Sequence, residues 1–145
     1  MTHTVEINQK QEVVFDYIAQ LEKHGEWQSA ILKSNKEPAG TTRLGTRNTE
    51  KRKMPGGIKD ITSEVIEYDP PKRISAKTVS KSPIIAIINI SLEPAKNGQA
   101  TIVNFQLTLE GRGIGKLFVS LTRKKSQQEI PNDLHRLKTH LERTN

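Results

Sequence analysis

The amino-acid sequence predicts an α+β fold in which a curved antiparallel β-sheet wraps around a long C-terminal helix. A short strand and a helical apolar pattern open the chain, alternating segments separated by turn signals fill its middle, and a long segment with helical periodicity closes it. With 145 residues the chain has the usual size of one domain, so we expect a single domain over residues 1–145.

The N-terminal part predicts one strand and two short helices. In TVEIN, Val5 and Ile7 alternate with polar residues, as is typical of a strand. From Gln11 the segment QEVVFDYIAQL carries apolar residues at helical spacing, and Gly25 ends this pattern. The segment EWQSAIL then favours a second short helix, which carries Trp27, the single tryptophan of the chain.

The middle of the chain predicts a meander of antiparallel strands. We expect them over residues 46–53, 58–68, 73–81, 84–93 and 100–110. The connecting segments MPGG, DPPK, KSP and AKNGQ are rich in turn-forming residues. In EVIEYDPPKRI, two consecutive prolines cannot both lie in a central strand, so the chain must turn there and form a hairpin.

The C-terminal segment contains two apolar stripes that do not share a helical face. At about 100° per residue, one face carries Ile114, Leu117, Phe118 and Leu121. The opposite face, about 180° away, carries Ile130, Leu134, Leu137 and Leu141. Pro131 disfavours helical geometry at the preceding residue and removes a backbone donor. We therefore predict a bend or break within residues 122–131, so that each piece buries its own stripe.

Composition and motif spacing exclude several kinds of site. Cysteine is absent, which excludes disulfides, thiolate metal sites and cysteine nucleophiles. His135 and His140 fall on different helical faces and the other two histidines are isolated, so we predict no metal site and no cofactor. No serine lies in a G-x-S-x-G pattern, and no residue is predicted to be catalytic.

The charge and hydropathy of the chain limit its partners and its location. The net charge is +7, but only 4% of the residues are aromatic and none are interleaved with the basic clusters, so we expect no specific nucleic-acid binding. The longest apolar run, PIIAIINI, is far shorter than the roughly 20 residues that span a bilayer. The N-terminus has no signal-peptide pattern, so we expect a soluble, cytoplasmic protein.

Four segments follow the order of a known fold. They are VEINQKQEVVFDYIAQLEKHGEW, GTR at 45–47, EVIEYDPPKRI at 64–74 and DLHRLKTHLE at 133–142. Through their order and spacing, the chain resembles the START-like or SRPBCC superfamily, nearest its polyketide cyclase/dehydrase-like branch. The resemblance implies a helix-grip fold with a cavity for a small hydrophobic or amphipathic molecule between the sheet and the C-terminal helix.

We expect residues from several elements to line this cavity: Val65, Val103, Phe105, Leu117 and Leu121. Trp27 would lie near its mouth, although a tryptophan that plugs the core fits the pattern equally well. Arg47 is the first candidate for a polar group inside, and a solvated strand arginine is the alternative. Along residues 58–68 the inward face is left open between Ile61, Ser63 and Val65 on one side and Ile58, Ile66 and Tyr68 on the other.

Two classes of function follow. Binding or carriage of a small lipid-like or polyketide-like molecule needs only the cavity, and we favour it because no acid or base is placed inward by the pattern. A cyclase or dehydratase acting on an apolar substrate is the alternative. A buried Glu64, Asp60 or Arg47 facing Trp27 would support chemistry, whereas an all-aliphatic cavity would support carriage.

Two macromolecular contacts complete the expectations. Basic residues at Lys51, Arg52, Lys53 and 123–125 favour a transient contact with an anionic membrane. Ile85 and Ile87 make the strand at 84–93 apolar on both faces, which favours a homodimer formed through the back of the sheet.

Overall fold

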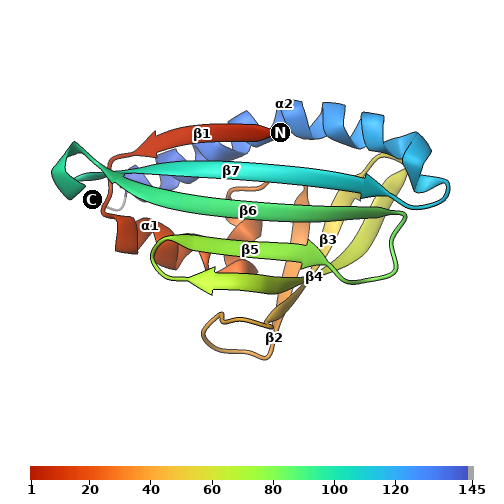
Figure 1. The fold of residues 1–145 in the computed structure, drawn as a ribbon, viewed down its shortest axis with the longest axis horizontal. Helices are drawn as coiled ribbons and strands as arrows, with labels where there is room; N and C mark the ends of the chain where they lie inside the picture. Colours follow the sequence, from red (N-terminus) through yellow and green to blue (C-terminus); the bar gives the residue numbers. More distant parts are fainter. Residues whose placement is uncertain (144–145) are drawn as a thin grey trace.

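The computed structural model describes residues 1–143 and shows one curved antiparallel sheet with the C-terminal helix lying along it (Figure 1). The strands of the sheet are β1 (Thr2–Ile7), β2 (Ile31–Glu37), β3 (Arg47–Met54), β4 (Gly57–Asp69), β5 (Arg73–Thr78), β6 (Ile84–Ala95) and β7 (Ala100–Gly111). They are ordered β1-β7-β6-β5-β4-β3-β2. The helices are α1 (Gln11–Ile18) and α2 (Gly115–Arg143), with short 3₁₀ turns η1 (Leu21–Glu26) and η2 (Lys96–Gly98). The predicted fold class is confirmed.

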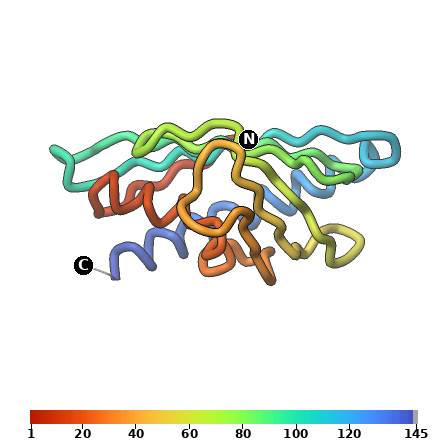
Figure 2. The backbone as a smooth tube through the Cα atoms, turned by 90° about the horizontal axis from the view of Figure 1, so that it is seen from below, coloured from red at the N-terminus to blue at the C-terminus, as the bar shows by residue number. Residues whose placement is uncertain are grey.

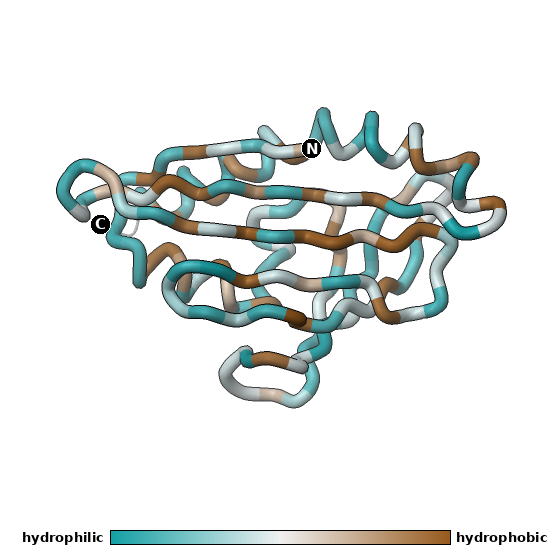
Figure 3. The backbone as a smooth tube through the Cα atoms, in the orientation of Figure 1, coloured by the Kyte–Doolittle hydropathy of each residue, from teal (hydrophilic) through white to brown (hydrophobic). Residues whose placement is uncertain are grey.

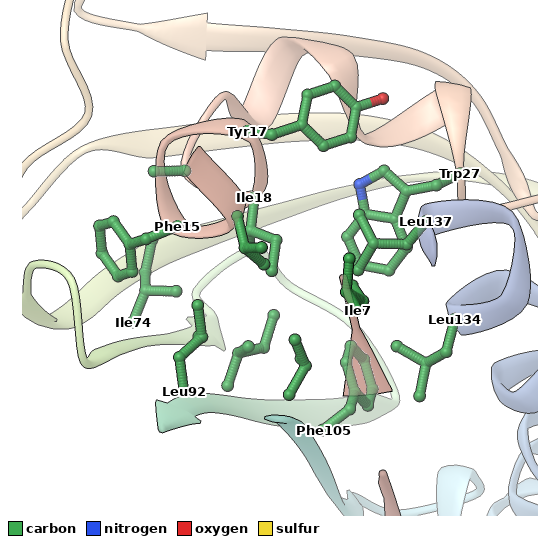
Figure 4. Close-up of a cluster of buried hydrophobic side chains, with 14 of the residues drawn as sticks. Ile7, Phe15, Tyr17, Ile18, Trp27, Ile74, Leu92, Phe105, Leu134 and Leu137 are labelled. Carbon is green, nitrogen blue, oxygen red and sulfur yellow. The ribbon is translucent and has the colours of Figure 1, made fainter. Parts of the chain in front are cut away.

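The helices lie on one face of the sheet and build the core against it. Figure 2 shows α1, η1 and α2 on the same side of the strands. The buried cluster between them joins Ile7, Phe15, Trp27, Phe105 and Leu137 from five different parts of the chain (Figure 4). Each inward strand residue alternates with an outward one, so the sheet presents one apolar face to the helices.

The predicted meander corresponds to strands β3 to β7, because the turn residues decide where the chain reverses. The DPPK segment joins β4 to β5 with Asp69 opposite Arg73. In the AKNGQ segment, Lys96 and Asn97 adopt positive φ values of 50° and 56° between β6 and β7. An asparagine tolerates this left-handed geometry better than most residues, which explains why the Asn-Gly pair predicted a hairpin.

The segment after Gly25 differs from the prediction. The second short helix is the 3₁₀ turn η1, which ends just before Trp27, and no helix covers EWQSAIL. The residues from Ile31 onward instead form β2, an edge strand that pairs antiparallel with β3. Most of its side chains reach solvent, so ILKSNKE lacks the apolar alternation by which a strand is recognised.

The break predicted in the C-terminal helix is wrong, while its alternative, a bend, stays a prediction. Helix α2 continues without interruption from Gly115 to Arg143, through Pro131. It buries a single face along its whole length, with Thr122, Ile130, Leu134, Leu137 and Leu141 among the buried residues. The other apolar stripe, which begins at Ile114, is left in solvent. The mismatch between the two stripes is therefore resolved by exposure of one of them.

The back of the sheet combines a buried isoleucine with exposed apolar side chains. Ile85 is buried within the single chain, whereas Ile66 and Val79 are exposed. Ile87 is only partly buried, so the dimer through this face stays a prediction. Within residues 1–143, no helix has the length and apolar character needed to cross a bilayer.

Candidate functional site

A cavity of about 100 Å³ lies between the inner face of the sheet and the middle of helix α2. Its walls are mostly apolar, because they are formed by the side chains that point inward at every second position along each strand. The strands contribute Ile61, Ile84, Ala86, Ile88, Phe105, Leu107 and Leu109. Helix α2 covers this face with Thr122, Ser126, Glu129, Ile130, Asp133 and Leu134, and Trp27 forms part of the wall.

One end of the cavity is polar and charged. On strand β3 the inward face carries Asn48, Glu50 and Arg52, which are spaced two residues apart. Arg52 Nη1 lies 3.0 Å from Glu50 Oε1 and donates to Gln28 Oε1 at 3.4 Å. Asn48 Nδ2 donates to the second oxygen of Glu50 at 3.4 Å. We call Gln28, Glu50 and Arg52 the polar cluster.

The carboxyl group of Glu50 is held in its ionised form. Burial works against ionisation, but the nearby His24 ring and the Arg52 guanidinium outweigh it and lower the pKa of Glu50 below its ordinary value of 4.5. His24 Nδ1 is 3.8 Å from Glu50 Oε2, which is too long for a hydrogen bond, so the two groups form an ion pair only when the ring is protonated. The charges of Glu50 and Arg52 compensate each other inside the protein.

The polar cluster separates two hollows. A second cavity of about 60 Å³ lies toward α1 and η1, lined by Ile18, Leu21, Val65, Ile74 and Ile90. Gln28, Glu50 and Arg52 line both cavities. The partly exposed Arg52 side chain thus lies at the boundary between the two hollows.

Trp27 and Phe105, two of the expected cavity residues, line the main cavity. Their ring centroids are 6.5 Å apart and the rings meet edge to face (Figure 4). Trp27 is only 1% exposed, so it closes the interior and is not at an open mouth. It serves as a core plug that also lines the cavity, whereas its burial does not match the position near the mouth, which was the other alternative that its sequence context left open.

Val65 and Val103 are buried but lie beside the main cavity. Val65 lines the second hollow, and with Ile61 and Ser63 it belongs to the inward face of β4. Ile58 and Ile66 are exposed on the other face. However, a β-bulge between Val65 and Glu67 changes the phase, so Tyr68 packs against the core with its ring centroid 5.7 Å from that of Phe15. Val103 is fully buried in the core cluster and lines neither cavity.

The expected positions of the other three residues are corrected by the structure. Leu117 and Leu121 belong to the exposed stripe of α2, because the helix does not break and turns its other face to the sheet. Arg47 points outward from β3, and its Nε donates to Glu64 Oε1 at 3.0 Å. Arg52 is the arginine that reaches the cavity.

The residues that sequence reasoning missed are polar residues on an inward strand face. Apolar alternation finds an inward face only when that face is apolar, and β3 shows polar residues on both sides. The i, i+2 spacing of Glu50 and Arg52 was the available signal, since two such side chains share one face of a strand. The buried hydroxyl of Thr122, which has no hydrogen-bond partner in the described part of the chain, was hidden by the helix-break prediction.

Comparison with known families and structures agrees with this architecture. Residues 1–142 match the family model described as polyketide cyclase / dehydrase and lipid transport. The chain belongs to this family. A search of curated proteins gave no match.

Several solved structures have the same fold as this family member. Their sequences are only distantly similar to it. A START superfamily protein from Mycobacterium smegmatis aligns with a TM-score of 0.77 at 13% identity, over 100% of this chain and 98% of its own. The ZhuI aromatase/cyclase from Streptomyces sp. R1128 aligns with a TM-score of 0.78 at 14% identity, over 99% of this chain and 93% of its own. A protein from Deinococcus radiodurans aligns with a TM-score of 0.71 at 18% identity, over 100% and 98%. At these identities the likeness shows the fold.

Proposed function

We propose that this family member binds a small, mostly apolar molecule in the main cavity and holds a polar group of that molecule at the polar cluster. The observation that carries this proposal is a mostly apolar cavity whose wall includes a charged pair on β3. Burial of apolar ligand surface contributes about 25 cal/mol per Å². The few polar groups at the end of the cavity would fix the orientation of the ligand.

The size of the cavity limits the ligand. At about 100 Å³ it is comparable with engineered core cavities of about 150 Å³ that bind a single aromatic ring. Longer molecules need the second hollow as well, which lies behind Arg52. The proposed ligand is therefore either a small ring compound or a longer molecule whose binding displaces the Arg52 side chain.

A binding test uses two arginines of the same strand. Native mass spectrometry of the protein purified from its host identifies a retained small molecule, and Trp27 fluorescence then reports its affinity. Arg52→Met should weaken binding of that molecule about tenfold or more, because a charge-assisted hydrogen bond contributes roughly 1.5–3 kcal/mol. Arg47→Met changes an exposed arginine on the opposite face and should leave affinity unchanged. Equal affinities for both variants, with folding intact, would contradict the proposal.

Cyclase or dehydratase chemistry is a second candidate, and one observation favours it. Glu50 places a carboxylate at the wall of the cavity that Trp27 also lines. Because the ion pair with Arg52 lowers its basicity, this carboxylate could take a proton from a bound substrate once Arg52 moves away. The name of the Streptomyces neighbour, an aromatase/cyclase, supports the same direction. Glu50→Gln should then abolish turnover of the retained molecule while preserving its binding. Absence of any turnover by the wild-type protein would leave carriage as the function.

A further inference from the structure

The first turns of helix α2 expose an apolar stripe to solvent. Four side chains at spacing i, i+3, i+4 and i+7 form it: Ile114 (71% exposed), Leu117 (76%), Phe118 (40%) and Leu121 (54%). Figure 3 shows this hydrophobic stretch at the end of the molecule where β7 leads into α2. We call these four residues the α2 stripe. Side chains at this spacing share one face of a helix, and that face is normally the one that packs on the core.

The exposure of the α2 stripe is imposed by the packing of the opposite side of the helix. Gly115 lies so close to the chain at Pro83 that an added Cβ atom would be 1.9 Å from the Pro83 carbonyl oxygen. The backbone N–H of Arg112 donates to the same oxygen at 2.8 Å. Further along, Thr122 is buried under the helix. The helix cannot rotate its stripe inward without breaking these contacts.

Basic residues outnumber acidic ones around the α2 stripe; Glu110 and Glu129 flank this segment, and Glu129 Oε1 lies 3.7 Å from Lys125 Nζ. Residues 111–128 contain Arg112, Lys116, Arg123, Lys124 and Lys125 and no aspartate or glutamate. The tip of the β3–β4 hairpin lies beside them, because Lys125 Nζ donates to the Lys53 carbonyl oxygen at 3.1 Å. This hairpin adds an exposed isoleucine, Ile58, and exposed Lys53 and Lys59. Arg52 does not belong to this surface, since it lines the cavity.

We propose that the α2 stripe and its basic rim dock onto an anionic lipid surface, with the stripe inserted among the lipids and the lysines and arginines at the head groups. A helix with one apolar face and a cationic border lies in the interface of such a membrane. Each Lys or Arg near an anionic bilayer contributes roughly 1 kcal/mol to the attraction. A second copy of the chain fits this surface poorly, because symmetric pairing would bring the basic rims together.

The docking surface and the cavity share the same helical turns. Thr122 and Ser126 line the cavity from the inner side of α2, and Leu121 lies on its outer side. A docked helix would thus place the cavity wall directly at the lipid surface. The docking itself does not depend on what the cavity binds, so the two proposals can fail separately.

Vesicle sedimentation tests the proposal with the full chain. Wild-type protein should bind vesicles of phosphatidylglycerol and phosphatidylcholine, lose binding in high salt, and bind pure phosphatidylcholine vesicles much less. The double variants Leu117→Ser/Phe118→Ser and Arg123→Glu/Lys124→Glu should each weaken binding about tenfold or more. Leu44→Ser and Lys33→Glu/Lys72→Glu change exposed residues elsewhere and should bind as the wild type does.

Three outcomes would overturn the proposal. Equal binding to neutral and anionic vesicles would remove the role of the basic rim. Unchanged binding by the stripe variant, with its circular dichroism and unfolding curve as in the wild type, would remove the role of the α2 stripe. A wild-type dimer in analytical ultracentrifugation that Leu117→Ser/Phe118→Ser converts to a monomer, without vesicle binding by either form, would assign the stripe to self-association.

Discussion

At the residue scale, the candidate site depends on a charged pair within a mostly apolar interior. Glu50 and Arg52 are both largely removed from solvent, with side-chain exposures of 12% and 22%. Two charges in such a place are stabilising only while each has its partner, because an unpaired buried charge carries the full cost of its desolvation. Gln28 and Asn48 provide the remaining hydrogen bonds.

Removing one member of the pair should therefore be more harmful than removing both. We expect Glu50→Ala to lower the free energy of unfolding by about 3 kcal/mol, because Arg52 is then left without its counter-charge. The double variant Glu50→Leu/Arg52→Met should lose less than Glu50→Ala alone. Urea unfolding of the variants measures this, with the outward pair Arg47→Met/Glu64→Leu as control. A double variant that loses the sum of both single effects would show that the two charges do not interact.

The pH dependence of stability should carry the signature of Glu50. Its folded-state pKa is lowered below 4.5, so the folded protein holds the carboxylate more strongly in its ionised form than the unfolded chain does. This contribution is fully present above the unfolded pKa and is lost as the pH falls through the folded pKa. Glu50→Gln should accordingly flatten the loss of unfolding free energy in that acidic range. A variant whose acid limb matches the wild type would contradict the assignment.

The individual site residues show where sequence reasoning reaches its limit. Phe105 was predictable because β7 alternates apolar and polar residues, so its inward face is unambiguous. Glu50 and Arg52 were not, since both faces of β3 are polar and the register of a strand decides which of them enters the cavity. Arg47 directly precedes Asn48, which points inward, so its own side chain points outward.

At the element scale, the apolar periodicity of helix α2 predicted the positions of its two stripes but not which of them is buried. Its two apolar stripes were read correctly from the sequence, but periodicity does not say that every stripe must be buried. The continuous helix Gly115–Arg143 buries the stripe that contains Leu137 and exposes the one that contains Leu117. The strands were better predicted, because the turns between them depend on local backbone chemistry at proline, glycine and asparagine.

Two leucines of the same helix test this arrangement. Leu137 is fully buried in the core cluster, so Leu137→Ala should lower the free energy of unfolding by about 2–5 kcal/mol. Leu117 is 76% exposed, so Leu117→Ala should change it by less than about 0.5 kcal/mol. Because both variants replace leucine by alanine in the same helix, the change in helix propensity is the same in both. Urea unfolding then compares their free energies of unfolding directly. A large loss for Leu117→Ala would mean that the stripe is covered in solution.

At the scale of the whole molecule, the sheet and helix enclose space that their side chains do not fill. The inner face of the sheet is apolar, while the α2 segment above the cavity presents the small polar residues Thr122 and Ser126. Larger apolar residues at these two positions would fill the gap, whereas the large apolar residues of these first helical turns lie on the outer side, in the α2 stripe. The same placement of side chains therefore creates both the cavity and the exposed stripe.

Filling the cavity should separate binding from stability. Ala86 lies on the cavity wall in β6, partly buried between Ile84 and Ile88. Inserting extra carbons into a packed core usually costs about 1–3 kcal/mol, but here the added side chain has a cavity to occupy. We expect Ala86→Leu to change the free energy of unfolding by less than about 1 kcal/mol and to abolish the Trp27 fluorescence response to the retained molecule.

A second alanine provides the matched comparison for this last experiment. Ala100, at the start of β7, is 1% exposed and lines neither cavity, so Ala100→Leu has no space to fill. It should destabilise the protein by about 1–3 kcal/mol and leave the affinity for the molecule unchanged, as measured at a temperature where the variant is folded. If Ala86→Leu were as destabilising as Ala100→Leu, the space above Ala86 would be closed in solution. If it preserved binding, the molecule would occupy the hollow behind the polar cluster, because that hollow does not include Ala86.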